Sequence, residues 1–234
     1  MTLTIHPVPG LPEIRPGDDL AALLADALAR AGLGPEPGDI LVVTHKAVSK
    51  AEGAVVPLEG DEEAAYRRLA REQAVEILRR RGDLIITRTR HGFVCANSGV
   101  DRSNAAPGTA VLLPADPDRS AHGLRMALRH RTGVDVPVVI TDTFGRAWRR
   151  GLVDVAIGVS GLEAVLDLRG TKDAQGRELK VTQVAVIDEI AAAADLAMGK
   201  AAGIPAALIR GLAAPRGEGR ATDLVRPADE DMFR

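Results

Sequence analysis

The stretch VVITDTFGRAWRRG, residues 138–151, joins an apolar run to a cluster of charge. Its valines and isoleucine are typical of a strand that is buried on both faces. We expect this strand to end at Thr141, Asp142 and Thr143, and the chain to turn at Gly145. Because hydroxyl and carboxylate oxygens are the ligands that Mg²⁺ and Mn²⁺ prefer, the strand end is a candidate metal site.

Three arginines follow the expected turn: Arg146, Arg149 and Arg150. Guanidinium groups bind phosphate and carboxylate groups through two parallel hydrogen bonds, so this cluster could hold an anionic substrate beside the metal. The alternative is that Asp and Thr are ordinary strand-end residues and that the arginines are solvated. The segment by itself leaves both interpretations open.

Composition restricts the class of protein. The chain has 234 residues, of which 46% are hydrophobic and 26% charged, as in ordinary soluble globular proteins. A formal net charge of −2 argues against bulk attraction to nucleic acid or to an anionic membrane. No apolar run is long enough for a membrane span, and the N-terminus does not resemble a signal peptide. A single cysteine, Cys95, fits a reducing compartment, so we expect a cytoplasmic protein and a buried, inert thiol.

Periodicity predicts the elements. Strands are expected at residues 3–8, 39–45, 84–90, 93–97, 110–114, 136–143, 153–160, 162–168, 180–187 and 204–212. Helices are expected at residues 20–31 after an Asp19 cap, 61–81, 118–131 and 188–203 after an Asp188 cap. Strands outnumber helices, so we predict one mixed α+β domain over residues 1–234, in which mixed sheets carry flanking helices. Residues 213–234 form a polar tail that we expect to be peripheral.

Standard fingerprints are absent. The chain has no G-x-x-x-x-G-K-[ST] loop, no G-x-G-x-x-G loop and no G-x-S-x-G elbow. One cysteine and five histidines also argue against a thiolate zinc site. A protein of this sequence that handles phosphates or metals must use oxygen ligands and another loop design.

Two further segments place polar side chains after predicted strands. In NSGVDRSN, residues 97–104, Asp101 is a candidate second carboxylate for the cation of Asp142. In THKAVSKAEG, residues 44–53, Lys50 could hold a phosphate at the end of a buried strand. The alternatives are an ordinary polar loop and a solvated pair of lysines.

Two more segments could present backbone to a ligand. In AMGKAAGIP, residues 197–205, glycines flank Lys200, and exposed amides there could cradle an anion. The alternative is an ordinary helix C-terminus. The segment PGLPEI, residues 9–14, is an extended loop that either contacts a nucleotide or only connects elements. We expect Trp148 to be a packing or interface anchor, and the alternative is a platform on which a ligand stacks.

These segments occur together, in the same order, in one family. The sequence resembles the coenzyme F420-0:L-glutamate ligases, also called F420 gamma-glutamyl ligases, along most of its length. The matching stretches are GLPEIRPGDDL, GDILVVTHKAVSKAEG, ANSGVDRSN, VVITDTFGRAWRRG, DEIAAAADLAMGKAAGIPAALIRG and DLVRP. Many actinobacterial relatives carry a further nitroreductase-like domain after the segment that corresponds to DMFR, so this chain resembles the stand-alone form.

The resemblance implies GTP-dependent ligation. In this family the γ-phosphate of GTP is thought to be transferred to a carboxylate of F420-0, a deazaflavin. The amine of L-glutamate then displaces the phosphate to form an amide, and later rounds add γ-linked glutamates. The resemblance also implies Mg²⁺ or Mn²⁺, a benefit from K⁺, and an intertwined homodimer with an α+β fold.

The resemblance also implies roles for single residues. Asp101 and Asp142 match metal-binding aspartates and, with Lys50, are the implied catalytic residues, whereas Thr143 matches a ligand of a second metal. The implied nucleotide contacts are Leu11, Pro12, Glu13, Ile14, His45, Lys50, Asn104, Met198, Gly199, Lys200, Ala201, Ala202, Gly203, Ile204 and Pro205.

The chain departs from the family at two positions. Archaeal relatives carry MGQ, with a metal-binding glutamine, where this chain has Lys200, and an ammonium group cannot ligate a cation. His45 stands where relatives often have a smaller or an amide side chain. Two other functions remain open: a metal-dependent phosphotransferase or nucleotide hydrolase with another acceptor, and a nucleotide-binding regulatory module without turnover.

Overall fold

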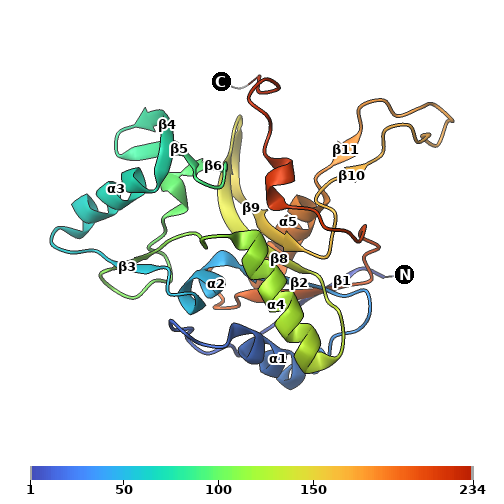
Figure 1. Cartoon of the computed structure of the whole chain (residues 1–234), viewed down its shortest axis with the longest axis horizontal. Coiled ribbons are helices and arrows are strands. Elements are labelled where there is room, and N and C mark those ends of the chain that lie inside the picture. The colour runs from blue at the N-terminus through green and yellow to red at the C-terminus, as the bar shows by residue number, and fades with distance from the viewer. Residues whose placement is uncertain (1, 233–234) are drawn as a thin grey trace.

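The structure is a computed structural model that describes residues 2–232 (Figure 1). It has the predicted mixed α+β fold. A five-stranded sheet with the order β1-β12-β2-β8-β9 forms the centre. Its strands are β1 (Thr4–Pro7), β12 (Ala206–Arg210), β2 (Ile40–Thr44), β8 (Val138–Arg146) and β9 (Arg149–Ser160). Strands β2 and β8 are parallel, and the other neighbouring pairs are antiparallel.

Helices cover both faces of this sheet (Figure 1). Helices α1 (Leu20–Arg30) and α4 (Pro117–Thr132) pack on one face, where they meet Leu41 and Val43 of β2. Helix α5 (Val186–Met198) packs on the other face, against the neighbouring side chains of the same strand. Successive residues of a strand point to opposite faces, so the buried part of β2 must be apolar on both faces, as the first four residues of ILVVT are.

A smaller unit lies beside the central sheet (Figure 1). Helix α3 (Glu62–Glu72) packs near an antiparallel sheet of β4 (Ala74–Arg81), β5 (Leu84–Thr89) and β6 (Val94–Ala96). The remaining elements are α2 (His45–Ala51), the pair β3 (Val55–Pro57) and β7 (Thr109–Val111), the pair β10 (Leu166–Asp167) and β11 (Gln183–Val184), and the short 3₁₀ helices Asn97–Gly99 and Ala221–Leu224. Residues between β10 and β11 form a projecting arm (Figure 1).

Most predicted elements are confirmed, including the Asp19 cap, which accepts a hydrogen bond from the amide of Ala22. The hairpin around Gly92 is also present as β5 and β6. The helix predicted over residues 61–81 is wrong in its second half, because residues 74–81 form β4. The apolar spacing of this half also suits a helix, but Gly82, at φ +59°, turns the chain so that the segment pairs with β5.

Three other details differ from the sequence prediction. Strand β8 continues past Thr143 and Gly145, and the turn falls at Ala147 and Trp148 instead. The polar residues therefore lie within a long hairpin and not at a strand tip. The strand predicted at residues 180–187 is reduced to β11, since α5 already begins at Val186, and the strand predicted at residues 162–168 is reduced to β10.

The cap of α5 is also not Asp188. The capping position is Ala185, and Asp188 lies in the first turn, where its carboxylate accepts a hydrogen bond from the amide of Ala156 at 2.9 Å. Burial raises the pKa of Asp188 above its ordinary value. Its side chain therefore joins α5 to β9, and the helix begins before it.

The tail is less peripheral than its composition suggests. Ala221 is only 1% exposed, and the amide of Gly219 donates to the carbonyl of Leu162 at 3.0 Å. The last two residues of the predicted tail, 233–234, lie outside the described part of the chain, as does residue 1. Cys95 is buried, as predicted. Between residues 2 and 232, none of the helices is both long and apolar enough to span a bilayer.

Candidate functional site

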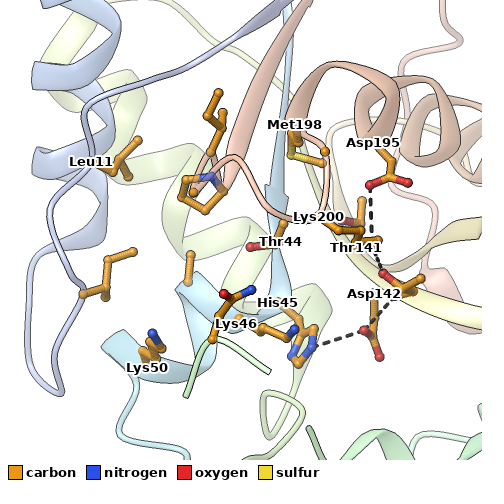
Figure 2. Close-up of a pocket in the computed structure, with 18 of the residues that line it drawn as sticks. Leu11, Thr44, His45, Lys46, Lys50, Thr141, Asp142, Asp195, Met198 and Lys200 are labelled. Atoms are coloured by element: carbon orange, nitrogen blue, oxygen red, sulfur yellow. Dashed lines mark hydrogen bonds and ion pairs between the residues drawn. The ribbon is translucent and has the colours of Figure 1, made fainter. Parts of the chain in front are cut away.

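A pocket opens where β2 ends beside the middle of β8, at the last residue pair of their parallel ladder (Figure 2). Thr44 and Thr141 are paired across these strands, and the side chains that follow each of them line the pocket. Two loops form the other walls: residues 11–14, which precede α1, and residues 199–205, which follow α5. Clefts at the carboxyl ends of parallel strands are frequent ligand sites because the side chains of separate loops converge there.

His45 and Asp142 face each other on the pocket floor (Figure 2). The Nε2 atom of His45 lies 3.2 Å from Oδ1 of Asp142, and His45 is 1% exposed. The same carboxylate oxygen accepts a hydrogen bond from the amide of Thr143 at 2.7 Å. Within residues 2–232, both of these contacts of the Asp142 carboxylate are made by Oδ1. The other oxygen, Oδ2, is therefore available to a ligand.

Asp101 meets the pocket through Lys46. The ammonium group of Lys46, which lines the pocket, lies 2.7 Å from the carboxylate of Asp101. The amide of Ser103 also donates to Asp101 at 2.6 Å. Burial alone would raise the pKa of Asp101, but Lys46 and the Ser103 amide outweigh it and hold the pKa below its ordinary value. Asp101 is therefore a charged carboxylate that already binds a cationic group.

Lys50 lies on α2, one turn after His45. Its side chain is 12% exposed, and its ammonium group lies 2.5 Å from the carboxylate of Glu13, which is 72% exposed. This ion pair joins the loop of residues 11–14 to α2 across the mouth of the pocket. An exposed carboxylate can move away at small cost, so Lys50 can exchange Glu13 for an anionic ligand.

A second carboxylate on the central sheet, Asp154 of β9, also lines the pocket. Asp154 is 2% exposed, and it accepts hydrogen bonds from the hydroxyl groups of Thr141 at 3.1 Å and Thr143 at 2.6 Å. Lys200 completes this cluster at 2.8 Å from Asp154. Sequence reasoning missed Asp154, although a single acidic residue within the apolar strand VDVAIGVS was a usable signal.

Most of the residues singled out by sequence line this one pocket. They are Leu11, Pro12, Glu13, Ile14, His45, Lys50, Asn104, Asp142, Thr143, Met198, Gly199, Lys200, Gly203, Ile204 and Pro205. Ala201 and Ala202 belong to the same loop but do not line the pocket, and Asp101 reaches it only through Lys46. The nucleotide and metal roles of these residues remain predictions.

The arginine cluster does not join the site. Arg146, Arg149 and Arg150 are exposed at the end of the β8–β9 hairpin, and none of them lines the pocket. The hairpin continues beyond the sheet, which carries these side chains away from Asp142. The hypothesis that they face an anion beside the metal is therefore not supported within this chain. Trp148, at the turn, is 85% exposed, so it does not act as a packing anchor within the described chain.

The carboxylates of Asp142 and Asp101 could supply part of the ligand shell of one divalent cation. Asp142 offers an available oxygen, and Asp101 offers a charged carboxylate once Lys46 moves. Residues 2–232 contain no group of three or more His, Cys, Asp or Glu side chains that could hold a metal ion. Mg²⁺ usually takes only one or two carboxylates and completes its shell with water and substrate phosphates, so such a sparse set is sufficient.

The residues do not fit the second metal that the family resemblance implied. The hydroxyl group of Thr143 donates to Asp154 and accepts a hydrogen bond from the ammonium group of Lys200. A cation at Thr143 would lie against that ammonium group, and two positive charges at contact distance repel strongly.

A recessed pocket that gathers lysines, carboxylates and open loops beside the central strands is typical of enzymes that bind small anionic molecules. Comparison with known proteins gives the particular family. A family model described as F420-0:Gamma-glutamyl ligase matches residues 10–211, and the chain belongs to this family of ligases.

Curated relatives match the chain along its whole length. The coenzyme F420:L-glutamate ligase of Methanopyrus kandleri is 46% identical over 252 aligned residues, which cover 100% of this chain and 98% of the relative. The protein of the same name from Methanothermobacter thermautotrophicus is 42% identical and covers 100% of both chains. That from Archaeoglobus fulgidus is 43% identical, with 100% of this chain and 97% of the relative covered.

Proposed function

We propose that this protein joins L-glutamate to coenzyme F420-0 in a GTP-dependent reaction and then adds further γ-linked glutamates. The reaction would proceed through an acyl phosphate on the acceptor carboxylate, which the glutamate amine attacks with loss of phosphate. Full-length similarity to proteins named coenzyme F420:L-glutamate ligase supports the acceptor and the amino acid. The observation that carries the proposal in this chain is the convergence of separate loops and charged side chains on the single pocket of Asp142.

We propose that the nucleotide lies along the loop of residues 199–205. Gly199 and Gly203 have φ values of +62° and +66°, a backbone conformation that favours glycine and leaves amides without a covering side chain. Such amides can hold phosphate oxygens. Lys50 would exchange Glu13 for a phosphate and so neutralise part of the negative charge.

We also propose that Asp101 and Asp142 hold a divalent cation, Mg²⁺ or Mn²⁺. A bound cation of this kind would neutralise the phosphate oxygens during transfer. The support is the available oxygen of Asp142 and the affinity of Asp101 for a cationic group, which Lys46 now provides. Lys46 would then be free to contact the phosphates or the acceptor. A benefit from K⁺ is part of the same proposal.

We further propose that the protein acts in the cytoplasm as a homodimer. The support for a dimer is a set of large apolar side chains that are exposed on the β8–β9 hairpin and the β4–β5–β6 sheet: Val75, Ile77, Val94, Trp148 and Leu152. Exposed apolar side chains in such number on neighbouring elements are typical of an interface.

The proposed activity is tested with the purified chain, F420-0, GTP, Mn²⁺, K⁺ and L-glutamate. Mass spectrometry should show stepwise glutamyl addition, and omission of GTP should abolish it. If no glutamate is added with any combination of Mg²⁺ or Mn²⁺ and GTP or ATP, the proposal is wrong. Phosphate release without glutamate addition would instead indicate a nucleotide hydrolase, and nucleotide binding without turnover would indicate a regulatory module.

A further inference from the structure

A buried negative charge requires a partner at the edge of the pocket. Asp154 is 2% exposed, and its neighbours Thr141 and Thr143 contribute only neutral hydroxyl groups to its carboxylate. Hydroxyl donors satisfy lone pairs but leave the charge unbalanced, and an uncompensated buried charge is strongly destabilising. A cation must therefore accompany Asp154.

Lys200 supplies this cation. Its ammonium nitrogen lies 2.8 Å from Asp154 and 3.5 Å from Asp195, and it donates to the hydroxyl group of Thr143. An ammonium group has three donors; here it donates hydrogen bonds to Thr143 on β8 and Asp154 on β9, and Asp195 on α5 is an ion-pair partner. Figure 2 shows Lys200 and Asp195 on the same side of the pocket as Asp142. Burial would lower the pKa of Lys200, but Asp154 and Asp195 raise it above its ordinary value, so the group is charged at neutral pH.

The oxygens around Lys200 are of the chemical type that also binds divalent metal ions. Two carboxylates and a hydroxyl group are hard ligands of the type that Mg²⁺ and Mn²⁺ prefer. Their distances to the Lys200 nitrogen show that one cationic centre already occupies the space between them. A divalent ion and an ammonium group cannot both contact the same carboxylate without strong repulsion, since the energy varies inversely with their separation.

We propose that Lys200 is a built-in cation, which occupies the position between Thr143, Asp154 and Asp195 and makes a divalent ion there unnecessary. Lys200 follows the last residue of α5 by two positions, and its side chain is 56% exposed, so part of it also faces the pocket. Any contact of Lys200 with the phosphates of a nucleotide would rest on the proposed function, whereas the exclusion of a divalent ion from this position is argued from the contacts of Lys200 alone.

The test counts bound Mn²⁺ by electron paramagnetic resonance of the free ion, in the presence of GDP. Lys200→Gln removes the ammonium group and supplies an amide oxygen, so we expect it to bind one more Mn²⁺ per chain than the wild type. Lys180→Gln, on the exposed arm, is the matched control and should equal the wild type. Equal numbers of ions in Lys200→Gln and the wild type would overturn the inference.

A double variant locates the additional ion. Lys200→Gln with Asp154→Asn should return the count to that of the wild type, and an additional ion that persists would lie elsewhere and overturn the inference. Should Lys200→Gln fail to fold, Lys200→Ala serves in a thermal melt. Its melting temperature should be below that of the wild type and should rise more than that of the wild type when Mn²⁺ is added. A rise no larger than that of the wild type contradicts the inference.

The Mn²⁺ count tests the inference about Lys200 independently of the proposed ligase activity. The difference between variant and wild type reports on Lys200 even if the wild type itself binds no Mn²⁺ or makes no glutamylated product. Conversely, the wild type could add glutamate while Lys200→Gln binds no additional ion. That result would support the proposed ligase function and exclude the inference about Lys200.

Discussion

Replacement of Asp142 by asparagine is expected to collapse turnover while it preserves the fold. The oxygen that accepts the Thr143 amide remains in asparagine, so the local backbone contact survives. The unit charge beside His45 and the pocket is lost. Two unit charges about 4 Å apart at an effective dielectric constant of about 20 interact by about 4 kcal/mol. If this interaction is realised mainly in the transition state, the rate falls by about 10³-fold.

The assay is the rate of glutamyl addition to F420-0 at saturating GTP and Mn²⁺, measured by mass spectrometry. Asp167→Asn on the exposed strand β10 is the matched control, and it should retain the wild-type rate. Circular dichroism and a thermal melt establish that Asp142→Asn is folded. A variant that is folded and keeps its rate within about fivefold, which is about 1 kcal/mol, would refute the proposal that Asp142 holds the cation that neutralises the reacting phosphates.

Three further predictions concern binding, stability and reactivity. Lys50→Met should weaken GTP binding by about 10- to 100-fold, the effect of a lost charged hydrogen bond, and calorimetry that finds unchanged affinity contradicts its role. Arg125 holds the pKa of Asp135 below its ordinary value, so the stabilisation by Asp135 is present at neutral pH and is lost as the pH falls through its folded pKa. Asp135→Asn should therefore lower the free energy of urea unfolding by about 1–3 kcal/mol at pH 7 and by progressively less below about pH 3.9, and a difference independent of pH would be inconsistent with this ion pair. Burial raises the pKa of Cys95 to about 12, so thiol reagents at pH 8 should label it only after denaturation, and rapid labelling of the folded protein would show that the thiol is accessible.

The sequence predicted well those elements whose local residue pattern matches the surroundings that the folded chain gives them. The first four residues of β2 are apolar because helices cover both faces of the sheet, and α1 begins after Asp19 because the Asp19 carboxylate caps its first turn. Residues 74–81 show the limit. Their apolar spacing suits a helix, and only pairing with β5, a contact between separate segments, decides for a strand.

The site was predictable as separate segments, but not as an arrangement. Sequence indicated Asp142, Lys50 and the loop around Lys200, and these lie in one pocket. Sequence reasoning missed Asp154: its place within an apolar strand was a usable signal, but the lysine that pairs with it comes from another element. It also allowed the hypothesis that the arginines face an anion beside Asp142, since it ended β8 too early.

The most direct test of the account is a crystal structure of the protein with GDP and Mn²⁺, with the ions located by anomalous scattering. We predict the diphosphate in the pocket between residues 11–14 and residues 199–205. An anomalous peak should lie against Asp142 and Asp101, and Lys200 should remain against Asp154. A nucleotide bound outside this pocket, or an ion with no contact to Asp142, would contradict the central claim.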